Sequence, residues 1–189
     1  IDIPTEDIDK YEKAKTDINL EEIKAIEKIT QHDVKARIEA FVKVSGAKEH
    51  LHKGMTSRDL TDNVEQMQIK KASQLVFGKY LSVLRHFCDK AQEYENIILT
   101  ARTHHQAAQP TLLGRRFSMW AEELNLNLLG FEHSINNYPL RGIKGPVGTQ
   151  FDMLTLLGDK KKVELLERKA AEELGFFKVL YSPGQVYPR

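Results

Sequence analysis

The stretch Ser57–Ala91, SRDLTDNVEQMQIKKASQLVFGKYLSVLRHFCDKA, decides the fold. Its apolar side chains recur at helical spacing and mark one face of a single helix. These side chains are Leu60, Val64, Met67, Leu75, Leu81, Leu84 and Cys88. Such a helix is far longer than the globular mean of roughly 11 to 12 residues. A second long pattern starts after Gly114 and runs to about Asn137. Two long helices joined by a loop predict an antiparallel bundle.

Two shorter amphipathic helices are predicted ahead of the long one, over residues 20–29 and 34–42, because isoleucine, leucine, valine and phenylalanine recur there at helical spacing. Between them stands Gln31-His32-Asp33. An aspartate in this position can accept a hydrogen bond from a free backbone N–H, so Asp33 is expected to cap the second helix. This places His32 at a helix start.

The segment Thr100–Leu113 is polar and carries Pro110, so we expect a loop at one end of the bundle. Prolines and glycines gathered between residues 139 and 148 exclude helix there. A further helix is predicted over Asp159–Leu174, closed by Gly175 as its C-cap, before a short extended piece over residues 176–181. The predicted fold class is all-α: a small N-terminal helical domain over residues 1–56, and an incomplete long-helix bundle over residues 57–189.

Composition excludes several functional classes. The 28 basic and 27 acidic residues are interspersed and leave a net charge of +1, which argues against nucleic acid as the main partner. No apolar run approaches the length of a membrane span, so a cytoplasmic location is expected. Cys88, the only cysteine, sits in an apolar helical pattern and is interpreted as a buried, inert thiol, and no metal-ligand cluster is predicted.

Thr56 and Ser57 form the first candidate site. They stand at the start of the long helix, where unpaired backbone N–H groups and the positive end of the helix dipole favour an anion such as a carboxylate or phosphate. Both hydroxyls can donate a hydrogen bond to it. Simple capping by Ser57, with Asp59 in the first turn, explains the same residues equally well.

The second candidate is Thr103-His104-His105, inside the polar loop. A histidine titrates near neutral pH, so one of the pair could protonate a leaving group. Adjacent residues usually point in different directions, so at most one of the two is expected to be the acid. Surface or structural histidines remain the alternative, with Arg102 as an ordinary ion-pair partner. The glycine-rich stretch 142–150 is not a Walker A loop, because its second glycine lacks the following Lys-Ser/Thr.

Four motifs in this order resemble the adenylosuccinate lyase branch of the fumarase/aspartase superfamily. His32-Asp33-Val34-Lys35-Ala36 is similar to its first histidine segment, and His52-x-Gly-x-Thr56-Ser57-x-Asp59 to its Thr-Ser-x-Asp signature. Arg102-Thr103-His104-His105-Gln106 resembles its Arg-Thr-His-Gly-Gln motif, and Lys144-Gly145-Pro146-Val147-Gly148-Thr149 its later glycine-rich loop. Ser182-Pro183-Gly184-Gln185 looks like the glutamine segment that follows.

The resemblance implies β-elimination of fumarate from adenylosuccinate and from SAICAR, a related carboxamide intermediate of purine synthesis, without a cofactor. By position, His104 corresponds to the general acid and His32 to a histidine acting on the phosphate and leaving-group side. Substrate-binding positions carried over are Thr56, Ser57, Thr103, Gln185 and Asp33. In the family, active sites are shared among subunits of a homotetramer.

Departures from the family pattern are equally specific. His105 stands where many relatives have glycine, and Gln31 where some have arginine. The family's catalytic serine loop, Gly-Ser-Ser-x-Met-Pro-x-Lys, does not occur in these residues, nor does an early Arg-Tyr motif. We therefore expect the chain to be a fragment that is inactive by itself. Rival hypotheses are another lyase or cycloisomerase of the superfamily, and a non-catalytic helical scaffold.

Overall fold

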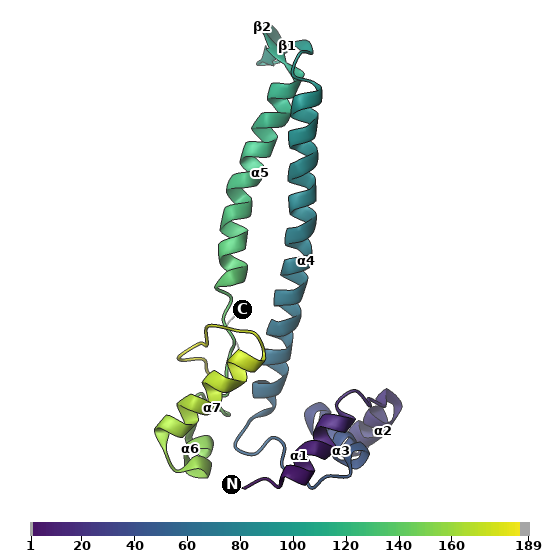
Figure 1. The fold of residues 1–189 in the computed structure, drawn as a ribbon, viewed down its shortest axis with the longest axis vertical. Coiled ribbons are helices and arrows are strands. Elements are labelled where there is room, and N and C mark those ends of the chain that lie inside the picture. Colours follow the sequence, from purple (N-terminus) through teal and green to yellow (C-terminus); the bar gives the residue numbers. More distant parts are fainter. Residues whose placement is uncertain (1, 186–189) are drawn as a thin grey trace. The chain divides into compact units, whose positions relative to one another are not determined.

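The computed structural model describes residues 2–185 and contains seven helices among them, so the all-α prediction is confirmed (Figure 1). The helices are α1 (Thr5–Ala14), α2 (Leu20–Thr30), α3 (Asp33–Ser45), α4 (Ser57–Glu93), α5 (Leu113–Asn136), α6 (Phe151–Leu157) and α7 (Lys160–Glu173). Contacts divide the described chain into two compact units: residues 2–66 with 139–185, and residues 67–138. The domain division at residue 56 stays a prediction.

In the first unit, α1 and α2 both pack on α3. Tyr11 of α1 stacks on Phe41 of α3 with ring centroids 5.6 Å apart. Helix α1 is not among the predicted helices, because its short amphipathic pattern precedes the clearer one of α2. Asn19 caps α2 by accepting the amide N–H of Glu22 at 3.1 Å. These contacts fix the entry of the chain into α3, where His32 lies.

The cap of α3 corrects one prediction. His32 is the N-cap residue, and its side chain accepts the N–H of Lys35, whereas Asp33 is the first helical residue. Asp33 does not occupy the cap position, and its carboxylate forms an ion pair with Arg37, one turn further along, at 2.8 Å. An imidazole nitrogen with a free lone pair performs the same task as a carboxylate oxygen, which a scan for Ser, Thr, Asp and Asn overlooks.

The start of α4 buries a polar stripe. Asp59, Asp62, Asn63 and Gln66 occupy the helical positions i, i+3, i+4 and i+7 that usually carry apolar side chains, and all four are buried. Asp59, Asn63 and Gln66 hold the segment 139–145 by hydrogen bonds to its backbone, and Asp62 lies 3.5 Å from Nε of Arg141. Asn63, for example, donates to the carbonyl of Gly142 and accepts its N–H, both at 3.0 Å. This part of the core is therefore specified by hydrogen bonding rather than by apolar packing.

Helices α6 and α7 complete the first unit. Asp159 caps α7 by accepting the N–H of Lys161 at 2.8 Å. The C-cap is Leu174, one residue before the predicted Gly175, which follows it with φ +76°. The two-turn helix α6 is not among the predicted helices. Leu140 pairs with the segment after α7, since its N–H donates to Lys178 at 2.8 Å and its carbonyl accepts from Leu180 at 2.9 Å.

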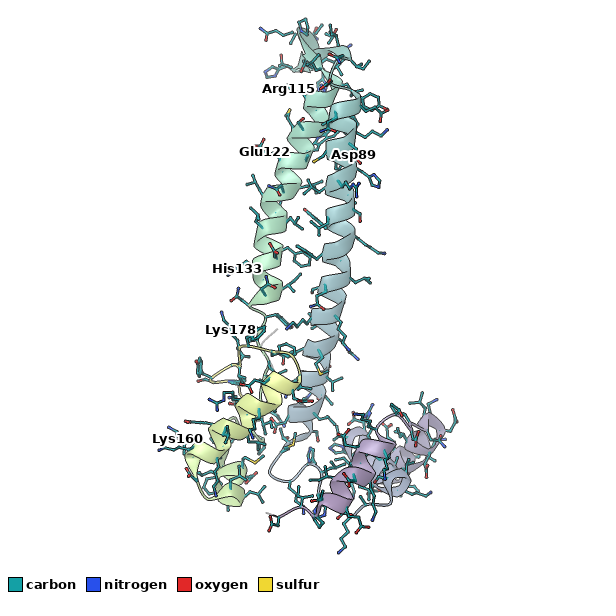
Figure 2. The ribbon with its side chains drawn as sticks, viewed as in Figure 1. Asp89, Arg115, Glu122, His133, Lys160 and Lys178 are labelled. Carbon is teal, nitrogen blue, oxygen red and sulfur yellow. The ribbon has the colours of Figure 1, made fainter. Side chains whose placement is uncertain are left out.

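In the second unit, α4 and α5 run side by side, and an aromatic cluster forms between them (Figure 1). Phe117 of α5 lies 5.8 Å from Tyr94 and 6.0 Å from Phe87, centroid to centroid. Cys88 is exposed, which corrects the prediction of a buried thiol, because the neighbouring Phe87 occupies the side of α4 that meets α5. His133 is also exposed, near the end of α5 (Figure 2).

The connection between these helices is an antiparallel β-hairpin rather than the predicted loop: β1 (Ile98–Thr103) pairs with β2 (Gln106–Leu112). Pro110 is accommodated because each strand of a two-stranded sheet is an edge strand, where a missing N–H is tolerated. The register shifts between Thr100 and Arg102. Within residues 2–185, no helix is long and apolar enough to cross a membrane.

Candidate active site

His32 and Ser57 are in contact, although they are far apart in the sequence. His32 Nε2 lies 3.1 Å from Ser57 Oγ, while His32 Nδ1 accepts the backbone N–H of Lys35 at 3.3 Å. A neutral imidazole has one N–H and one acceptor nitrogen, so the cap bond to Nδ1 assigns the proton to Nε2. Nε2 then donates to the Ser57 oxygen. The hydroxyl hydrogen of Ser57 is left to donate to a ligand.

A pocket of about 370 Å³ lies beside this pair. Its lining includes the basic or titratable side chains of His32, Lys35, His52 and Lys53, together with Ser57. It also includes Glu39 and Glu49, so the wall presents both signs of charge. Lys35 pairs with Glu39 at 3.7 Å, which offsets one of these negative charges, and the α4 N-terminus adds its own positive end. The pocket is suited to an anionic ligand.

His52 is a residue that sequence reasoning left without a role. Its backbone is left-handed, with φ +65°, and its Nε2 atom is buried without a hydrogen-bond partner in the described part of the chain. An unsatisfied buried polar atom calls for an explanation, and a ligand oxygen in the adjoining pocket would supply the missing partner. The signal in the sequence was available, since His52 stands four residues before Thr56, inside the same motif.

Asp33 is committed to local contacts. Its burial raises the pKa of the carboxyl, but the hydrogen bonds from the Val34 N–H and from Arg37 outweigh burial and hold that pKa below its usual value. Asp33 Oδ1 is also 3.6 Å from Nδ1 of His32. The carboxylate is thus ionised and already partnered at the start of α3, and its assignment to substrate binding stays a prediction.

Asp59 forms the centre of a buried polar cluster behind Thr56 and Ser57. Its carboxylate accepts the N–H of Thr56 at 2.8 Å, as the third helical residue of a capping box does. It also accepts the N–H groups of Lys144 at 2.8 Å and Gly145 at 3.0 Å, and it forms an ion pair with the fully buried Arg141. The Thr-Ser-x-Asp motif and the glycine-rich loop are therefore joined through one carboxylate.

The glycine-rich loop also packs on the segment that contains Gln185. Gly148 has φ +85°, and a Cβ atom on it would lie 2.2 Å from the carbonyl oxygen of Pro183. Only glycine allows this approach. Arg141 Nη2 donates to the carbonyl groups of Gly184 and Gln185, each at 3.0 Å, while the Gln185 side chain is exposed. Thr56, Ser57, His32 and Gln185 thus belong to the same compact unit.

Thr103 and His104 belong to the other unit, at the tip of the β-hairpin. Thr103 pairs with Gln106, so His104 and His105 are the two central residues of the turn, with φ +50° and +64°. Positive φ at both positions is the geometry of a type I′ turn, which strongly favours Asn-Gly or Gly-Gly. Arg102 steadies the turn by donating to the His105 carbonyl at 3.2 Å. Both imidazoles are exposed.

Comparison with known proteins decides the family. The sequence model of the lyase family matches residues 5–180. The chain belongs to this family. Adenylosuccinate lyase of Saccharomyces cerevisiae is 38% identical over 176 residues, covering 92% of this chain and 36% of the yeast enzyme. Adenylosuccinate lyase of Schistosoma mansoni is 34% identical over 191 residues, covering all of this chain and 40% of the relative.

Solved structures agree with the fold. The fumarate lyase of Mesorhizobium sp. BNC1 superposes with a TM-score of 0.82 at 20% identity, covering 95% of this chain and 42% of that chain. The 3-carboxy-cis,cis-muconate lactonizing enzyme of Pseudomonas putida gives 0.78 at 18% identity, covering 96% and 41%. These identities support the fold alone. The chain spans 36% to 40% of the length of the two adenylosuccinate lyases named above.

Proposed function

We propose that these residues form part of an adenylosuccinate lyase, which eliminates fumarate from adenylosuccinate to give AMP and from SAICAR to give AICAR. The observation that carries the proposal is the contact of His32 with Ser57 at the N-terminus of α4, next to a pocket whose lining includes histidine and lysine side chains as well as two glutamates. Two relatives that match at least nine tenths of the chain bear the name of this enzyme.

The chemistry fits the arrangement. Elimination requires removal of a proton beside a carboxylate, stabilisation of the resulting carbanion, and protonation of the departing nitrogen. The α4 N-terminus with the hydroxyls of Thr56 and Ser57 would hold a carboxylate of the succinyl group, and the N–H of His32 would orient the Ser57 hydroxyl toward it. The orphan Nε2 of His52 and the lysines of the pocket would take the phosphate or a second carboxylate. The catalytic base comes from outside these residues.

His104 is assigned the role of general acid, with Thr103 beside it. An exposed imidazole on a hairpin turn can donate a proton once a substrate lies against it. In the full-length enzyme, His104→Ala is expected to lower kcat for adenylosuccinate by about 10²- to 10⁴-fold, the usual contribution of a general acid. The loss of absorbance as fumarate leaves measures the rate.

His105→Ala provides the matched control, because it alters the neighbouring residue of the same turn and is expected to keep near-normal kcat. Near-normal turnover by His104→Ala would exclude His104 as the acid. The same assay separates the rival functions: a superfamily lyase or cycloisomerase of other specificity would leave adenylosuccinate intact and act on another substrate. A non-catalytic scaffold would convert none.

Assembly into a homotetramer is also part of the proposal. Large apolar side chains are exposed along the α4 and α5 segments of the second unit, and on a soluble protein such a surface marks an interface. They are Ile69, Leu75, Val76, Leu81, Val83, Met119, Leu126 and Leu129. Light scattering on the full-length protein, which we expect in the cytoplasm, should give four times the mass of one chain. A monomer would contradict shared active sites.

The 189 residues alone are expected to show no turnover.

A further inference from the structure

Arg141 is fully buried, with 0% of its surface exposed, and its guanidinium group contacts two parts of the site. Its Nη1 forms an ion pair with Asp59, and its Nε lies 3.5 Å from Asp62 Oδ2. Its Nη2 donates to the carbonyl oxygens of Gly184 and Gln185, both at 3.0 Å. One guanidinium thus joins the start of α4 to the backbone at Gln185.

Asp59 cannot itself serve as a ligand group. It accepts backbone N–H groups from Thr56, Lys144 and Gly145 in addition to the charge of Arg141, so the roughly four acceptor sites of a carboxylate are occupied. Through these bonds its position is fixed relative to Thr56. Arg141, which forms an ion pair with Asp59, is therefore held in register with the anion-binding end of α4.

The identity of this residue as arginine follows from the directions of its donors. A guanidinium presents five N–H donors in a rigid planar fork, whereas a lysine offers a compact point charge at the end of one flexible stem. Lysine could keep the ion pair with Asp59, but it could not at the same time reach the two carbonyl groups on the far side. The ion pair with Asp59 therefore requires only a positive charge, whereas the bonds to the two carbonyl groups require the geometry of a guanidinium.

We propose that Arg141 is a positioning residue that sets the backbone of Gln185, and hence its exposed side chain, in register with Thr56 and Ser57. The proposal rests on the proposed function, since it assumes that Gln185 contacts the same substrate as the α4 N-terminus. Arg141 acts on the substrate through the position of Gln185 relative to the α4 start, and the other hydrogen bonds of its guanidinium, to the carbonyl oxygens of Gly142 and Gly145 at 3.4 and 3.5 Å, reach only the glycine-rich loop. Its loss should therefore affect substrate binding in a way that depends on whether the Gln185 side chain is present.

The test is a double-mutant cycle in the full-length enzyme, with adenylosuccinate as substrate and with the variants Arg141→Lys, Gln185→Ala and the pair. Arg141→Lys is expected to raise KM about tenfold with a smaller change in kcat, as lost substrate positioning does. In the Gln185→Ala background the same change should alter KM less than about twofold, because residues that act as a unit are not additive.

Glu167→Gln is the matched control. Glu167 pairs with Lys144, the other buried cation of this region, at 2.7 Å, and neither residue hydrogen-bonds to Gly184 or Gln185 within residues 2–185. This variant should lower the melting temperature while leaving KM near that of the parent enzyme. A rise in KM equal to that of Arg141→Lys would show that general loosening of the first unit is the cause, and would overturn the proposal.

The outcomes distinguish the two proposals. No cleavage of adenylosuccinate by the parent enzyme would refute the proposed function. Normal cleavage with additive effects of Arg141→Lys and Gln185→Ala on KM would overturn the positioning role alone. If Arg141→Lys does not fold, Asp62→Asn replaces it, because that change weakens the contact at Nε and keeps Asp59. It should raise KM by a smaller factor that disappears in the Gln185→Ala background, and additivity there would again overturn the role.

Discussion

The buried cluster around Asp59 and the hairpin turn at His104 carry the two sets of candidate residues, and they are built in opposite ways. In the first unit, charged side chains with almost no exposed surface are matched by partners, as Asp59 is by Arg141 and three backbone N–H groups. In the second unit, two adjacent non-glycine residues hold left-handed backbone conformations on an exposed turn.

The difference shows where each part of the site obtains its precision. Hydrogen bonds within the first unit already fix the α4 N-terminus, the glycine-rich loop and the Gln185 backbone, so this half is organised before any ligand or partner arrives. Among residues 2–185, the exposed imidazole of His104 is positioned by the turn that carries it. In the proposed role of general acid, His104 would obtain low-dielectric surroundings from the substrate or from another subunit of the proposed tetramer.

The sharpest way to break this comparison is Arg141→Met, which removes the charge and keeps the length of the side chain. Asp59 would then be left buried without its counter-charge, and removal of one partner of a buried pair costs about 3 to 5 kcal/mol. Urea unfolding of the purified chain measures the loss. Arg168→Met is the control, because its pair with Glu172 is exposed and should contribute less than about 1 kcal/mol. Equal losses would mean that the cluster contributes no special stability.

A second test examines the packing of the glycine-rich loop. Gly148→Ala places a Cβ atom 2.2 Å from the Pro183 carbonyl at φ +85°, so strain and overlap together should cost about 2 to 4 kcal/mol. Gly145→Ala shares the positive φ, at +74°, but its Cβ would meet no atom within 4 Å, and about 1 kcal/mol is expected. Thermal unfolding compares the two. Equal losses of stability would mean that backbone strain alone sets the cost, and that the close approach to the Pro183 carbonyl contributes nothing.

The sequence predicted the long helices correctly because their apolar periodicity extends over many turns, as in Ser57–Glu93. It also named Thr56, Ser57 and His32 as site residues, and the structure brings His32 and Ser57 together. It failed where the deciding interactions are not periodic. Nothing in the local pattern shows that Asp59 pairs with Arg141, since the partners lie on different elements and meet only in the folded unit.

The hairpin was missed for a related reason. Residues 98–112 lack a clean alternation of apolar and polar side chains, because both faces of β1 and β2 are largely exposed, and Pro110 argued for a loop. The usual Asn-Gly turn signal is also replaced by His104-His105. Likewise, the cap of α3 was assigned to Asp33 because histidine is rarely considered as a capping residue. Both errors arise from residues chosen against local preference, and both lie beside candidate catalytic histidines.

That local conflict can be measured directly at His105. A left-handed conformation costs an ordinary L-residue roughly 1 to 2 kcal/mol. Glycine avoids this cost, but part of the gain is offset because a glycine gives the unfolded chain more conformational entropy to lose on folding. His105→Gly should therefore stabilise the hairpin by about 0.5 to 1 kcal/mol, seen as a higher melting temperature. His105→Ala keeps the backbone cost and should give no gain. A gain from alanine would implicate the imidazole instead of the turn.

The smallest effect on stability is expected from acid titration of Asp7, which reports on the hydrogen-bonded contacts of the first unit. Burial raises the pKa of Asp7, but hydrogen bonds from His50 and the Lys48 N–H, with the charges of Lys10 and His50, hold that pKa below its usual value. A lowered folded pKa stabilises the protein above the unfolded pKa, and that stability is lost as the pH falls through the folded value.

Asp7→Asn should consequently melt at a lower temperature than the parent near neutral pH. The difference should shrink as the pH falls through the lowered pKa of Asp7, because the protonated parent then resembles the amide variant. Melting temperatures measured between neutral pH and about pH 2 test this convergence. A constant offset over the whole range would mean that the Asp7 carboxylate stabilises by shape and hydrogen bonding alone. The satisfied contacts of the first unit would then owe less to charge than the buried cluster implies.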